Sequence, residues 1–186
     1  MSTSEWTVRG IIRRMLPVLV VLTTIELGSG IVLDTFESTL LRYPSLLVLV
    51  PVTIGMAGNL GSILAARLST ALHLGLLSFD AADERLAGNA VATLALALTV
   101  FPLVGAGAWL VQSLLGGTRL PFVTVVAVAL ASGVVLAALA VAVTTVTTYA
   151  AYRYGLDPDD VVIPVVTNVC DVLGVLVLFG AVRVLV

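Results

Sequence analysis

The sequence predicts an all-α integral membrane protein with five transmembrane helices, and three observations support this class. Hydrophobic residues make up 60% of the 186 residues and charged residues only 11%. The mean hydropathy is +1.17, so polar side chains are too few to cover a water-facing surface. Five apolar segments reach the length of roughly 20 residues that a helix needs to cross a bilayer. Only short breaks separate them, so we expect one compact bundle.

The first apolar segment covers residues 15–34 and follows a short segment, residues 1–14, that is expected to lie in the cytoplasm. The domain that spans the membrane is therefore expected to cover residues 15–186. The breaks carry turn-forming and charged residues, such as FDAADERLAGN and YRYGLDPDD. The remaining four helices are predicted over residues 45–70, 87–115, 121–150 and 160–185.

The arginine distribution predicts the orientation, because cytoplasmic flanks of membrane helices hold an excess of Lys and Arg. With a cytoplasmic N-terminus, six of the nine arginines lie inside and three outside. Five spans then place the C-terminus outside, in a multi-pass protein of the cell membrane that contacts lipid. A cleaved signal peptide is a competing interpretation of the first segment, but that segment is long, contains Glu26 and lacks a small-residue cleavage site.

Several classes of protein are disfavoured. The net charge of -2 is too small to suggest nucleic-acid binding, and the single Cys170 excludes a disulfide framework. We expect no enzyme, because the helices contain no Ser-His pair, no paired catalytic aspartates and no HExxH motif. No P-loop is present to couple the protein to nucleotide hydrolysis.

One carboxylate, Asp171, lies eleven residues after Asp160, inside the fifth apolar segment. A charge at that depth costs about 3 kcal/mol on insertion scales, so it usually marks an ion pathway or a polar partner. Asn59 lies eleven residues before Thr70, at the end of the second segment. At about 1.5 Å per residue, both side chains sit roughly 16 Å from the inner boundary, and they therefore share a level near the midplane.

Small and polar residues at helical spacing form a stripe on each of these two segments. Helix packing alone explains the glycines, and a hydrogen-bonded structural carboxylate alone explains Asp171. Together, oxygen ligands on two narrow faces suit a hard, hydrated cation, and without His or Cys pairs a soft metal is disfavoured. The stripes comprise Gly55, Gly58, Asn59, Ser62, Ala65, Ala66 and Ser69 on the second segment, and Pro164, Thr167, Asn168, Asp171 and Gly174 on the fifth.

Two runs carry a family resemblance. The run VPVTIGMAGNLGSILAARLSTALHLG, residues 50–75, contains GNL and RLST elements. The run GLDPDDVVIPVVTNVCDVLG, residues 155–174, has a T-x-x-x-D-x-x-G pattern at Thr167, Asp171 and Gly174. In order and spacing they resemble the MgtE magnesium channels and solute carrier family 41. The resemblance implies a five-helix pore domain that passes Mg²⁺ or other divalent cations, and a homodimer in which two such units surround one pore.

The resemblance also implies roles for individual residues. Two Asp171 side chains, one from each protomer, would face each other across the pore. Asn59 and the backbone carbonyls near Ala57 and Gly58 would accept hydrogen bonds from the waters of the ion, because Mg²⁺ dehydrates reluctantly. Thr167 and Asn168 would shape the ring of polar groups that surrounds the ion in this pore.

Two departures from the family pattern bear on regulation and selectivity. The bacterial channels carry a large cytoplasmic domain with paired CBS modules, and this sequence shows none, so we expect gating to differ. Ser62 and Ile63 occupy the positions at which the bacterial motif has Asn and Gln, and this difference bears on ion selectivity.

Other ionisable residues are secondary candidates. Glu26 is deep enough to coordinate an ion, to bind a proton or to make a structural hydrogen bond. Asp34 and Glu37 either concentrate cations at the outer mouth or lie in a solvated loop. His73 is expected at the inner interface. The loop acids either bind regulatory Mg²⁺ or cap helices, and they are Asp80, Asp83, Glu84, Asp157, Asp159 and Asp160.

Three functional hypotheses follow. The first is a divalent-cation channel driven by the electrochemical gradient, with Mg²⁺ as the transported ion. The second is a secondary transporter that exchanges the cation for H⁺ or Na⁺ through Glu26. The third is a non-conducting membrane subunit whose polar stripe packs against a partner.

Overall fold

The structure is a computed structural model that describes residues 7–79 and 83–186, and within these residues all regular structure is helical. Five helices are long and apolar enough to cross a membrane. One short helix connects the first two of them. The helices are α1 (Val8–Thr35), α2 (Glu37–Arg42), α3 (Pro44–His73), α4 (Glu84–Leu114), α5 (Phe122–Tyr154) and α6 (Pro158–Leu185).

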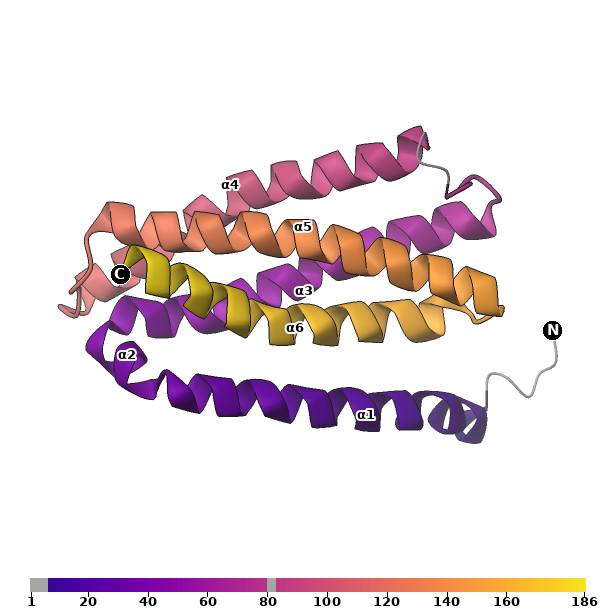
Figure 1. Cartoon of the computed structure of the whole chain (residues 1–186), viewed down its shortest axis with the longest axis horizontal. Coiled ribbons are helices and arrows are strands. Elements are labelled where there is room, and N and C mark those ends of the chain that lie inside the picture. The colour runs from indigo at the N-terminus through magenta and orange to yellow at the C-terminus, as the bar shows by residue number, and fades with distance from the viewer. Residues whose placement is uncertain (1–6, 80–82) are drawn as a thin grey trace.

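The long helices run along one common direction and form an elongated bundle (Figure 1). In the centre, α3, α5 and α6 pack against one another. One edge is formed by α4, which contacts α3 and α5, and the other by α1, which contacts α6. The start of α1 lies at the same end as the start of α6, and the C-terminus lies at the opposite end (Figure 1).

The predicted all-α, five-span architecture is confirmed, with differences at the helix ends. Helix α1 already begins at Val8, although its apolar span begins at Met15. Helix α5 continues to Tyr154, four residues beyond the predicted end at 150. Helix α2 was not predicted, because its six residues, ESTLLR, are too few to show an apolar period.

Carboxylates and glycines define several helix ends. Asp83 caps α4 by accepting hydrogen bonds from the backbone of Arg85 and Leu86. Its other oxygen accepts from Ser78, and this backbone hydrogen bond is the main reason that the pKa of Asp83 lies below its ordinary value of 3.8. Asp157 caps α6 in the same way, by accepting from the backbone of Asp159. Gly155, with φ of +63°, ends α5 in the left-handed conformation that favours glycine.

Small residues allow the central helices to approach closely. A Cβ added to Gly61 of α3 would lie 2.5 Å from Val166 and 3.3 Å from Cys170, both on α6. On α4, a Cβ on Gly105 would lie 2.8 Å from the Cα atom of Val126 on α5. This is the packing mode expected inside a bilayer, where dispersion contacts between close backbones replace the hydrophobic effect.

Candidate cation site

Asp171 lies at the middle of α6, as the fourteenth of its 28 residues. Its side chain is half-buried, and no described residue donates a hydrogen bond to it. A carboxylate at mid-helix in an apolar environment requires a compensating proton, cation, water or donor. Because the described part of the chain supplies no donor, a proton, a cation, water or a group outside the described residues must compensate this charge.

Gly58 of α3 directly faces this carboxylate. It is the fifteenth of the 30 residues of α3, so both helices contribute their midpoints to the site. A Cβ added to Gly58 would lie 3.0 Å from Oδ1 of Asp171 and 3.3 Å from Cγ2 of Thr167. The absence of a side chain at Gly58 therefore makes the space in which the Asp171 carboxylate lies.

The two polar residues that precede Asp171 on α6 are hydrogen-bonded to their own helix. The Thr167 hydroxyl donates to the carbonyl of Ile163 at 2.8 Å, and the Asn168 amide donates to the carbonyl of Pro164 at 3.1 Å. Oδ1 of Asn168 is buried and has no hydrogen-bond partner within the described chain. This amide oxygen is therefore an unused hydrogen-bond acceptor, one helical turn before Asp171 on α6.

The neighbours of Gly58 on α3 differ in exposure. Ala57 is fully buried, in a cluster with Leu136, Val166 and Cys170. Asn59 is exposed on the surface of the single chain. The structure therefore brings Gly58, Thr167 and Asp171 together, whereas the Asn59 side chain lies at the surface of the same level.

Glu26 belongs to the same level of the bundle. It is the twelfth of the 21 residues of the span Met15–Thr35, and it is half-buried where α1 packs against α6. Like Asp171, it is a carboxylate at the middle of an apolar helix, and the two helices pack against each other. Two like charges in one region of low dielectric repel each other unless a cation or a proton lies between or on them. Asp34, near the end of α1, and Glu37, at the start of α2, are in contrast exposed.

A second group of ionisable residues joins the ends of α3 and α6. Potential ligand atoms of His73, Asp157 and Asp159 all lie within 4.8 Å of one another, and all three residues are exposed. The Ser69 hydroxyl donates to Asp159 at 2.6 Å, which links the two helices. His73 was expected only as a residue of the inner interface. The equal depth that pairs Asn59 with Asp171 also pairs the end of α3 with the start of α6, so helical spacing contained a signal for this group.

The other loop acids have structural positions. The predicted alternative of helix caps is confirmed for Asp83 and Asp157. Glu84 lies in the first turn of α4 and Asp160 in that of α6, where a negative charge is favourable. Asp80 lies outside the described residues.

Five long apolar helices, one with a carboxylate at its middle, define a multi-pass membrane protein. The sequence profile of the MgtE family, described as a divalent cation transporter, matches residues 50–181, well over half of the chain. The chain therefore belongs to the MgtE family, as its two sequence runs indicate. The match includes Gly58 and Asp171, whereas Glu26, Asp34 and Glu37 lie before it.

Proposed function

We propose that this protein is a divalent-cation channel, with Mg²⁺ as its main ion, whose pore is lined by α3 and α6 of two protomers. The observation that carries the proposal is the half-buried Asp171 carboxylate at the middle of α6, which faces Gly58 and receives no hydrogen bond from the described chain. A passing cation compensates this charge without being held by a closed set of ligands. Membership of a divalent cation transporter family supports the same conclusion.

The residues around Asp171 suit a hydrated ion. Mg²⁺ keeps several of its waters, so ligands of the second shell accept hydrogen bonds from water. Oδ1 of Asn168 is an unused acceptor, and the exposed amide of Asn59 lies beside Gly58. In the proposed pore, these groups and the backbone carbonyls of Ala57 and Gly58 bind the waters, while Thr167 helps to shape the ring.

A second copy of the chain completes the proposed site. One protomer supplies a single carboxylate, while two supply up to two negative charges for one divalent cation. The exposure of Asn59 supports this arrangement, because an amide facing lipid at mid-membrane would lack hydrogen-bond partners. In this dimer the N-termini lie in the cytoplasm and the C-termini outside the cell membrane.

Permeation is driven by the electrochemical gradient in this proposal. Moving two charges through a potential of 100 mV releases about 4.6 kcal/mol, which is sufficient without nucleotide hydrolysis. A second half-buried carboxylate, Glu26 on the helix that packs against α6, favours one second candidate, an exchanger in which Glu26 carries a proton. In a channel, Glu26 only adds to the negative potential.

Flux measurements in liposomes test the proposal. Purified protein should let Mg²⁺ enter liposomes when a negative-inside potential is imposed, with no pH or Na⁺ gradient present. Entry that requires a H⁺ or Na⁺ gradient would show an exchanger instead. A purified dimer that gives no flux under either condition would support the third hypothesis, a non-conducting subunit.

A further inference from the structure

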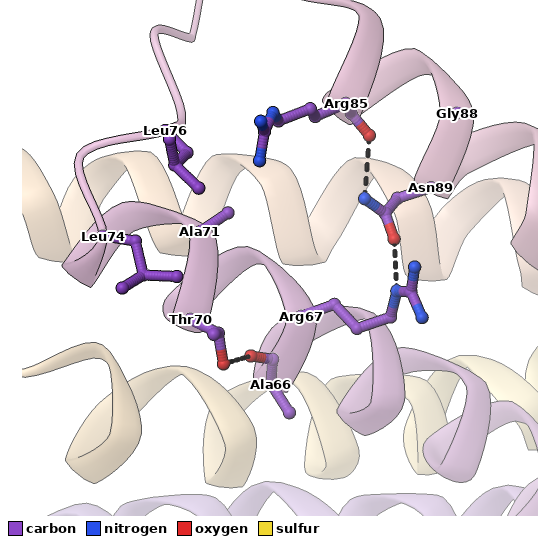
Figure 2. Close-up of a pocket in the computed structure, with 9 residues that line it drawn as sticks. All are labelled: Ala66, Arg67, Thr70, Ala71, Leu74, Leu76, Arg85, Gly88 and Asn89. Carbon is purple, nitrogen blue, oxygen red and sulfur yellow. Dashed lines mark hydrogen bonds between the residues drawn. The ribbon is translucent and has the colours of Figure 1, made fainter.

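A groove separates the last turns of α3 from the first two turns of α4 (Figure 2), whereas Asp171 lies at the middle of α6. Its volume is about 610 Å³. Four of its lining residues are polar or charged, and the rest are apolar or glycine. They are Ala66, Arg67, Thr70, Ala71, Leu74, Leu76, Arg85, Gly88 and Asn89.

Two arginines give the groove its charge, and Asn89 links them. The Nε atom of Arg67 donates to the side-chain oxygen of Asn89, and the Asn89 amide donates to the backbone carbonyl of Arg85 (Figure 2). The Arg85 guanidinium extends from α4 toward Leu76, on the opposite side of the groove. Among the described residues, none of those that line the groove is acidic.

The guanidinium groups retain most of their donors. A guanidinium has five N–H donors, and Asn89 takes only one from Arg67. Among residues 7–79 and 83–186, neither Arg67 nor Arg85 forms a salt bridge, and the Arg85 guanidinium makes no hydrogen bond. Two uncompensated cations on one concave surface attract an anion with several acceptor oxygens, and a phosphate has this geometry.

The position of the groove indicates where that phosphate comes from. Arg67 and Arg85 lie near the ends of two apolar spans, and Phe79 packs against Tyr149 and Tyr152 at the same end of the bundle. Aromatic residues of this kind mark the level of the lipid headgroups. Leu74 is 65% exposed and Leu76 is 44% exposed. A soluble phosphate would leave this apolar lining uncovered, whereas the glycerol and acyl chains of a lipid would cover it.

We propose that this groove binds the phosphate headgroup of an anionic phospholipid between Arg67 and Arg85. The lipid joins the end of α3 to the start of α4 and covers the exposed leucines. The inference does not depend on cation transport, because no groove residue belongs to the proposed pore ring.

Binding of phosphatidylglycerol to the purified full chain in mild detergent tests the inference, with native mass spectrometry and thermal unfolding as measurements. The wild-type protein should bind phosphatidylglycerol more tightly than phosphatidylcholine and should unfold at higher temperature with it. Arg85→Gln should weaken phosphatidylglycerol binding roughly fivefold, because one arginine at the membrane surface contributes about 1 kcal/mol. Since the Arg85 guanidinium makes no hydrogen bond within the described chain, this variant keeps the Arg67–Asn89 contact.

Arg153→Gln is the matched control, because Arg153 is exposed in the last turn of α5 but does not line the groove. Its binding of phosphatidylglycerol should equal that of the wild type. The inference is wrong if Arg85→Gln binds normally, if Arg153→Gln loses as much affinity, or if phosphatidylcholine binds equally well. Protection by millimolar inorganic phosphate that matches phosphatidylglycerol would show a site for a soluble phosphate and would also overturn it.

Discussion

Gly58 is the residue that gives the Asp171 carboxylate its space. A methyl group at this position would lie 3.0 Å from the carboxylate oxygen and 3.3 Å from Thr167. At least one of these groups must therefore move, and the proposed ring must change its shape.

Gly58→Ala should accordingly reduce Mg²⁺ flux in liposomes at least tenfold while the helix remains folded, since Ala is the better helix former by about 1 kcal/mol. Gly180→Ala is the control on α6, because a Cβ there meets nothing within 4 Å. Normal flux through Gly58→Ala would show that the contact between Gly58 and Asp171 has no part in conduction.

Glu26 distinguishes the two transport mechanisms at the residue scale. In a channel, Glu26→Gln removes one charge near Asp171, so conductance should fall by a few-fold with an unchanged requirement for the Mg²⁺ gradient alone. In an exchanger, the same substitution should abolish the coupling between Mg²⁺ and H⁺ movement. Simultaneous recording of Mg²⁺ and pH inside liposomes separates these results, and we expect no proton movement linked to Mg²⁺ in either wild type or variant.

At this scale, the sequence predicted which helices lie side by side, but not how each one is rotated. Helical spacing placed Thr167, Asn168 and Asp171 on one face of α6. The equal depth of Asn59 and Asp171 along their helices correctly suggested that α3 and α6 are neighbours. It did not predict that Gly58, rather than Asn59, directly faces Asp171, because a difference of one residue on a helix depends on the rotation of that helix. The proximity of His73 to Asp157 and Asp159 was not predicted for a similar reason. It depends on how the end of α3 and the start of α6 are placed in space.

Among the helices, α4 and α5 show how strongly small residues determine packing. Gly105 and Gly107 lie two positions apart on α4, but only Gly105 faces α5, where the Cα atom of Val126 lies 2.8 Å from the position of a Cβ. A backbone atom cannot move away as easily as a flexible side chain.

Gly105→Ala should therefore destabilise the bundle by roughly 1–3 kcal/mol, the usual cost of overpacking. Gly107→Ala, which meets nothing within 4 Å, should be neutral or slightly stabilising. Thermal unfolding in detergent compares the two variants. Equal stability of both would contradict the close approach of α4 and α5.

Helix existence was easier to predict than helix ends. Apolar length identified all five spans, because the bilayer sets a minimum length that soluble proteins do not require. The ends depend on local chemistry such as the Asp157 cap and the left-handed Gly155, and these shifted the boundaries of α5 and α6 by a few residues. The short α2 depends on contacts instead, since Phe36 at its start stacks on Phe179 of α6.

For the whole molecule, the single chain leaves several polar and apolar surfaces without partners. Asn59 is exposed at the middle of α3, and α1 is exposed along most of its length except where it meets α6. Lipid can cover the apolar face of α1, but it offers no hydrogen bonds to an amide. A sequence does not reveal how two copies meet, because the geometry of a dimer depends on the shapes of surfaces that only the folded chain presents.

The most direct test of the central claim combines the dimer with Asp171. Asp171→Asn keeps the size of the side chain but removes its charge, and Asp171→Ala removes its oxygen atoms as well. Glu84→Gln, a neutralised exposed carboxylate in the first turn of α4, is the control. Each variant is checked for its oligomeric state by cross-linking and is then assayed for Mg²⁺ entry into liposomes under a negative-inside potential. We predict that both Asp171 variants remain dimeric and lose Mg²⁺ entry while Glu84→Gln conducts normally; normal conduction by Asp171→Ala would contradict the account.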